Sequence, residues 1–63
     1  MTTKAQMKRI TDLVELIAVS ERDVKYAARI GDATRLAEGL GDLARFSGQL
    51  QLEAALQLTA AMR

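Results

Sequence analysis

The tetrapeptide Ile30-Gly31-Asp32-Ala33 lies near the middle of the 63-residue chain and predicts its main turn. Glycine adopts the left-handed backbone conformation that ends many helices, and aspartate is a preferred N-cap because its carboxylate accepts hydrogen bonds from unpaired backbone N–H groups. One helix is therefore expected to end at Gly31 and another to begin after Asp32. Two arms of about 28 and 30 residues around one short turn predict an antiparallel two-helix hairpin.

Both arms have the periodicity of helices. The chain has no proline, and apolar residues recur at spacings of three and four in each arm, which places them on one stripe of a helix with 3.6 residues per turn. We predict an all-α fold with helices over residues 3–30 and 33–62, in one domain that covers residues 1–63. The expected contact stripes are Met7, Ile10, Val14, Ile17, Val24 and Ala28, flanked by Leu13 and Ala27, and Leu36, Leu40, Leu43, Ser47, Leu50, Ala54 and Ala61, with Leu58 beside them.

Two short stretches are candidate breaks in these helices. The sequence Ser-Glu-Arg-Asp at residues 20–23 has the spacing of a capping box, which would restart a helix. The dipeptide Gly41-Asp42 repeats the sequence of the main turn, and a glycine inside a helix costs about 1 kcal/mol. A chain of three or four shorter helices is therefore the alternative to the hairpin.

Apolar residues also lie off the two contact stripes, which indicates contact with further helices. A chain of this length buries only about 60% of its unfolded surface, and without cysteine it cannot add disulfides. We predict that two hairpins pair into a four-helix bundle as a homodimer, or that a different helical protein covers the same surface. The predicted partner interface consists of Leu16, Val19, Tyr26, Ile30, Leu50, Leu52, Leu56 and Leu58. A second stripe of small residues, which would let another helix approach closely, consists of Ala37, Gly41, Ala44, Gly48, Gln51 and Ala55.

The residue types that carry most catalysis are missing. The chain has no histidine and no cysteine, so Ser20 and Ser47 have no imidazole to activate them, and thiolate or imidazole metal sites cannot form. Neither glycine-rich stretch has the Gly-Lys-Ser/Thr of a phosphate-binding loop. We expect a protein that is not an enzyme and uses no cofactor, no metal and no small-molecule substrate.

Overall charge and hydropathy exclude little else. Nine Lys and Arg against eight Asp and Glu give a net charge of +1, which favours neither nucleic acid nor membrane. The most apolar stretch, residues 46–62, is too short and too polar to predict a membrane span. Because the lack of cysteine fits a reducing compartment, we expect a cytoplasmic protein.

One arc of the first helix is basic, and it supports an alternative function. In a two-fold bundle, two such arcs could follow the phosphates of a nucleic acid. In length and inferred hairpin the chain resembles the Rop-like plasmid copy-number regulators, which are RNA-binding antiparallel four-helix bundles, and equally the two-helix cochaperones of bacterial secretion systems. The resemblance is one of architecture without a shared residue motif, so it implies no site residues. The candidate nucleic-acid contacts are Lys4, Lys8, Arg22, Lys25 and Arg29.

Together these patterns predict a non-catalytic protein-binding module. It would be an adaptor, a small chaperone or a regulatory subunit that self-associates or binds a partner helix through its Leu/Ala-rich second helix. The alternatives are an RNA-binding bundle that uses the basic arc, and a subunit that folds only within a larger hetero-complex.

Overall fold

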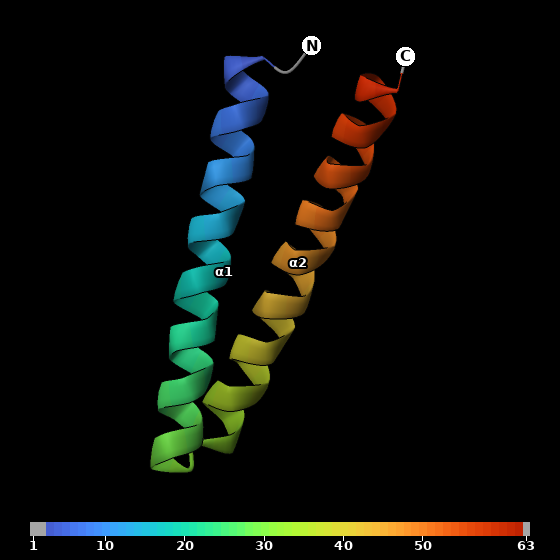
Figure 1. The fold of residues 1–63 in the computed structure, drawn as a ribbon. Helices are drawn as coiled ribbons and strands as arrows, with labels where there is room; N and C mark the ends of the chain where they lie inside the picture. Colours follow the sequence, from blue (N-terminus) through green and yellow to red (C-terminus); the bar gives the residue numbers. More distant parts are fainter. Residues whose placement is uncertain (1–2, 63) are drawn as a thin grey trace.

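The computed structural model describes residues 3–62, which form two α-helices joined by a tight turn (Figure 1). Helix α1 spans Lys4–Ile30 and helix α2 spans Ala33–Ala61. The helices run antiparallel and side by side, so the start of α1 and the end of α2 lie at the same end of the molecule, called here the open end. The Cα atoms extend over 48 × 17 × 12 Å. The expected helical hairpin is confirmed.

Local capping explains where α1 begins and where the turn lies. The Thr3 hydroxyl accepts a hydrogen bond from the Gln6 backbone N–H, and the Gln6 side chain accepts one from the Thr3 N–H, which makes a capping box. Gly31 adopts the left-handed conformation with φ 73°, and the Asp32 N–H donates to the Ala27 carbonyl at 3.0 Å. The Asp32 carboxylate then accepts from the Arg35 N–H at 3.0 Å, so one dipeptide ends α1 and begins α2.

Neither candidate break interrupts a helix. Helix α1 continues through residues 20–23, and α2 continues through Gly39 and Gly41. Ser20 is buried and therefore lies on the contact surface between the helices rather than at a helix start. The alternative of three or four shorter helices is wrong for the described residues.

The contact between the helices follows a heptad pattern, with buried and half-buried residues at alternating spacings of three and four. This pattern is typical of two helices that wrap around each other. The contact residues are Gln6, Ile10, Leu13, Ile17, Ser20, Val24 and Ala27 on α1, and Leu36, Gly39, Leu43, Phe46, Ser47, Leu50, Glu53 and Gln57 on α2.

The predicted contact stripes lie on one flank of the helices, beside the residues that form the contact, and this part of the prediction is wrong. Met7, Val14 and Leu40 are 55%, 51% and 48% exposed, although the sequence pattern placed them between the helices. Small and polar residues take their place in the contact. At Gly39 an added Cβ would lie 2.9 Å from Cγ2 of Val24, so the absence of a side chain is what allows the helices to approach here.

Figure 1 shows the two helices closest at the turn and diverging towards the open end. Near the turn the contact residues include Ala27 and Gly39, which have little or no side chain. Near the open end they include Gln6, Glu53 and Gln57, which are long and polar. The divergence therefore follows the size of the side chains that separate the helices.

The glycines of α2 provide a direct test of this packing. An added Cβ at Gly41 or Gly48 would meet nothing within 4 Å, so Gly41→Ala should stabilise the chain by about 1 kcal/mol through helix propensity. Gly39→Ala should instead destabilise it, since overpacking costs about 1–3 kcal/mol and the β-branched side chain of Val24 has few rotamers to move into. Urea denaturation of both variants measures the difference. Equal stabilisation by both changes would show that the helices do not meet closely at Gly39.

Candidate protein-binding surface

Many large apolar side chains of the hairpin are exposed. Among the described residues, Leu13 and Ala27 are the only buried apolar ones, whereas eleven large apolar side chains are exposed. The accessible surface is 4992 Å², while a compact monomer of 6.9 kDa is expected to expose about 4000 Å². The hairpin therefore exposes roughly 1000 Å² more than a chain of its mass does when it folds compactly.

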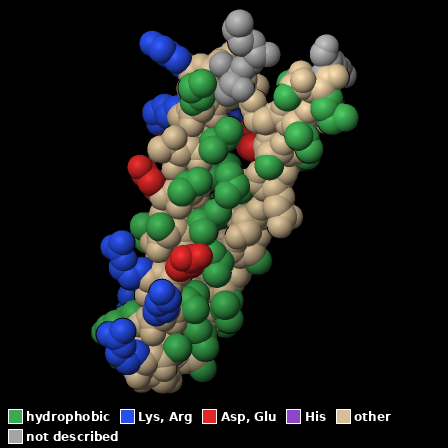
Figure 2. Space-filling view, viewed as in Figure 1, with side chains coloured by type: hydrophobic (Ala, Val, Ile, Leu, Met, Phe, Trp, Pro, Cys, Tyr) green, Lys and Arg blue, Asp and Glu red, His purple; other side chains and the backbone are tan. Residues whose placement is uncertain are grey.

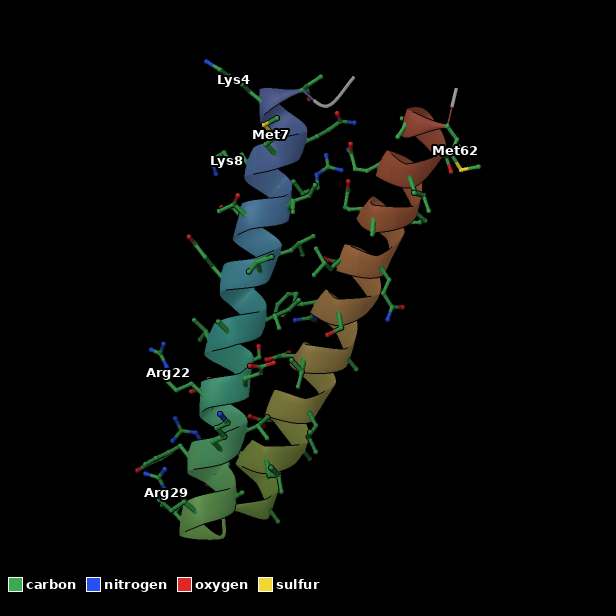
Figure 3. All side chains as sticks on the ribbon, in the orientation of Figure 1. Lys4, Met7, Lys8, Arg22, Arg29 and Met62 are labelled. Atoms are coloured by element: carbon green, nitrogen blue, oxygen red, sulfur yellow. The ribbon has the colours of Figure 1, made fainter. Side chains whose placement is uncertain are left out.

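These side chains lie on two opposite faces, because each helix presents a flank on either side of the contact. Figure 2 looks onto the first, the front face, where apolar side chains run along both helices. Figure 3 shows Met7 on this side of α1. Helical spacing places the rest of the front face on the same flanks. We define it by Met7, Val14 and Ala28 of α1 and Ala37, Leu40 and Leu58 of α2, all exposed.

The rear face combines apolar side chains with ionic contacts. The Arg35 guanidinium lies 3.9 Å from the Asp23 carboxylate and 4.9 Å from the centre of the Tyr26 ring, so it bridges the two helices on this side. Arg45 pairs with Asp42 at 3.0 Å. The apolar residues that define the rear face are Leu16, Val19, Tyr26 and Ile30 of α1 and Leu52 and Leu56 of α2, all exposed.

The predicted partner interface is thus divided by the fold. Six of its eight residues are those of the rear face. Leu58 is 64% exposed and lies on the front face. The sequence pattern placed it beside the predicted contact stripe. Leu50 is half-buried against α1 and contributes to the hairpin itself. That any of these side chains contacts a partner stays a prediction.

The front face is the surface that the sequence pattern missed, since Met7, Val14 and Leu40 were attributed to the contact within the hairpin. A signal was present in the sequence. Gly39, Phe46 and Glu53 recur at intervals of seven residues, and Gly39 and Glu53 prove to be buried. A heptad that passes through a glycine and a glutamate is easily discarded, because glycine has no apolar side chain and glutamate is almost never fully buried unless it is paired.

A part-buried ion pair joins the helices near the open end. Nη1 of Arg9 donates to Oε1 of Glu53 at 2.9 Å. The side chain of Glu53 is 8% exposed and that of Arg9 is 66% exposed. The carboxylate therefore sits between the helices, and the guanidinium neutralises it from the solvent side.

The basic arc of α1 lies on the outer side of the hairpin. Figure 3 shows Lys4, Lys8, Arg22 and Arg29 pointing away from α2, and Figure 2 shows Lys and Arg gathered along that margin. Lys8 donates to Asp12 at 2.9 Å, and this hydrogen bond raises the pKa of the Lys8 ammonium above its ordinary value. Within residues 3–62, no carboxylate forms an ion pair with Arg22, Arg29 or Lys25.

No three carboxylates among the described residues come together as a candidate metal site. A shallow hollow lined by Asp12, Glu15, Leu16 and Val19 is formed by α1 alone, so it is a depression on one helix rather than an enclosed cavity. Over the same residues, neither helix has the length and apolar character needed to cross a membrane.

No family model, no curated protein and no solved structure matches this chain.

Proposed function

We propose that this chain is a non-catalytic protein-binding module that self-associates into a four-helix bundle and acts as an adaptor, a small chaperone or a regulatory subunit. The observation that carries this proposal is the excess of roughly 1000 Å² of accessible surface together with the exposed apolar side chains of both helices. Soluble monomers rarely expose contiguous apolar patches larger than a few hundred Å².

A thin intramolecular core supports the same conclusion. Two helices cover each other on one side only, and the contact between them contains Ser20, Gly39 and Glu53 among its buried residues. Small domains without disulfides or metals usually gain the missing stability by oligomerisation. A second hairpin would extend the core without any new sequence. We place such a module in the cytoplasm, which a chain without cysteine fits.

Thermal unfolding of the full chain over a range of protein concentrations tests the proposal. If folding is coupled to self-association, the midpoint rises with concentration by mass action. A midpoint that does not change between micromolar and millimolar protein would contradict it.

Pull-down of the tagged chain from native lysate then identifies any other partner. One stoichiometric protein that is required for the chain to fold would show a subunit of a larger hetero-complex. Recovery of nucleic acid alone would favour the alternative function, in which the basic arc of α1 binds RNA.

The observation that favours this alternative is the set of cations without carboxylate partners on the outer side of α1. If the arc is only a solvated surface, Arg22→Ala combined with Lys25→Ala should change the stability by a few tenths of a kcal/mol and leave partner binding intact. Titration of RNA and DNA at several salt concentrations checks this. A steeply salt-dependent affinity that the double change removes would instead establish nucleic-acid binding. The control is Arg35→Ala combined with Arg45→Ala, which removes the same number of positive charges from the rear face.

A further inference from the structure

We propose that the front face is the surface on which a second copy of this chain docks, with the two hairpins face to face and the turn of each beside the open end of the other. This docking mode rests on the self-association proposed for the chain, to which it adds the contact surface and the orientation. The rear face then remains exposed in the dimer.

The distribution of charge favours the front face over the rear face. A docked partner on the rear face would have to cover the Arg35–Asp23 and Arg45–Asp42 pairs, and removing paired charges from water often costs more than their mutual attraction returns. The front face carries fewer charges: Glu21 lies on it, and Lys25 follows on the same flank of α1, about five helical turns after Met7. A partner therefore covers the front face at a lower desolvation cost.

The size of the surface favours a second copy as the occupant. The excess of roughly 1000 Å² is close to the roughly 800 Å² that each partner buries in an interface of standard size. Two-fold symmetry requires a surface that is complementary to itself. The front face meets this condition because it carries few charges and both helices contribute apolar side chains to it along their length. Two front faces in contact form a four-helix bundle with one continuous core.

The sizes of the side chains at the two ends of the front face favour one orientation. The large side chains Met7 and Leu58 lie near the open end of the front face, and the small Ala28 and Ala37 lie near the turn. An antiparallel arrangement places the large side chains of each copy against the small ones of the other. A parallel arrangement would oppose large to large and leave unfilled space over the alanines, whereas protein cores are close-packed.

Charge is consistent with this orientation. Glu21 lies on the front face in the half of α1 nearer the turn. A parallel pair would hold the two Glu21 carboxylates at the same level on either side of the two-fold axis, where like charges repel. An antiparallel pair separates them along the bundle.

Matched charge insertions test which face is buried. Val14→Glu with Leu40→Glu adds two carboxylates to the front face, at side chains that are 51% and 48% exposed in the hairpin. We expect this change to weaken self-association, measured by sedimentation equilibrium, at least about tenfold. Leu16→Glu with Leu52→Glu adds the same charge to the rear face, at side chains 43% and 62% exposed, and should weaken it less than about threefold. Dissociation by the rear-face pair alone would overturn the choice of face while self-association itself stands.

Thiol labelling gives the same information if the charged variants fail to fold. The chain has no cysteine, so Leu40→Cys and Leu52→Cys each introduce one reporter thiol. Reaction with a chromogenic disulfide reagent should slow for Leu40→Cys, and not for Leu52→Cys, as the protein concentration rises through the dimerisation range. The opposite pattern, or a dimer in which both thiols react freely, would contradict docking on the front face. A wild-type chain that stays monomeric would refute the proposed self-association instead.

A spin label attached at Thr34→Cys, an exposed position just after the turn, tests the orientation. In the antiparallel dimer the two labels lie about one helix length apart, on the order of 40 Å for a helix of 27 residues. In a parallel dimer both turns lie at the same end, and the labels would be within roughly 25 Å, about two helix diameters. Pulsed electron resonance distinguishes these distances, and the short one would overturn the antiparallel arrangement.

Discussion

Replacing Leu13 with alanine is expected to lower the free energy of unfolding by about 3 kcal/mol, within the range of 2–5 kcal/mol for buried Leu→Ala changes. Leu13 is 6% exposed and is the largest apolar side chain that the hairpin buries. The total stability of a chain of 63 residues is about 3–9 kcal/mol by the usual value per residue. This one truncation should therefore remove between about a third and all of the stability.

Leu16→Ala is the matched control for this prediction. Leu16 is the same residue type one turn further along α1, but it is 43% exposed on the rear face. Its truncation should cost less than about 1 kcal/mol, because little packing is lost. Urea denaturation at one fixed protein concentration compares the two variants. If Leu16→Ala were the more damaging change, the helices would not be in contact through Leu13.

The second large effect is expected at the part-buried ion pair between Arg9 and Glu53. Arg9→Ala would leave the Glu53 carboxylate, 8% exposed, without the guanidinium that neutralises it. Loss of one partner of a fully buried pair costs about 3–5 kcal/mol. Because Arg9 is 66% exposed and water screens the interaction, we expect a smaller loss, of about 2 kcal/mol.

A double-mutant cycle separates the ion pair from the rest of each side chain. Glu53→Leu replaces the carboxylate with an apolar group of similar size, so Arg9→Ala should cost much less in that background than in the wild type. Arg45→Ala serves as the control, since Arg45 pairs with Asp42 on the surface and both side chains are more than half exposed. A coupling near zero between Arg9 and Glu53 would show that the pair does not hold the open end together.

The turn was the part of the fold that sequence reasoning could predict well. Gly31 and Asp32 act through their own backbone conformation and their own hydrogen bonds, so the cause of the turn is local. Thr3 and Gln6 act locally in the same way at the start of α1. Such signals need no knowledge of the other helix.

The rotation of the contact stripe could not be predicted in this way because its causes are not local. Hydrophobicity alone favours Val14 and Leu40 for the core over Ser20 and Gly39. Gly39 is buried because Val24 of the other helix lies where a Cβ would project. Glu53 is tolerated between the helices because Arg9, 44 residues away in the sequence, neutralises it.

The candidate binding surface was predictable in kind but not in position. Surplus apolar residues such as Leu52 and Leu56 already indicated a partner, and both are exposed in the hairpin as expected, at 62% and 54%. The front face became visible only after the true contact stripe was known. The charges that distinguish the two faces depend on Arg35 reaching across to Asp23, which is a tertiary contact.

Sedimentation equilibrium of the wild-type chain tests self-association most directly. The chain has a mass of 6.9 kDa. We predict that the weight-average mass rises with concentration to twice this value and no further, with helical content that rises in parallel because folding and association are coupled. A fully helical chain that sediments as a 6.9 kDa monomer across the micromolar range would contradict the account.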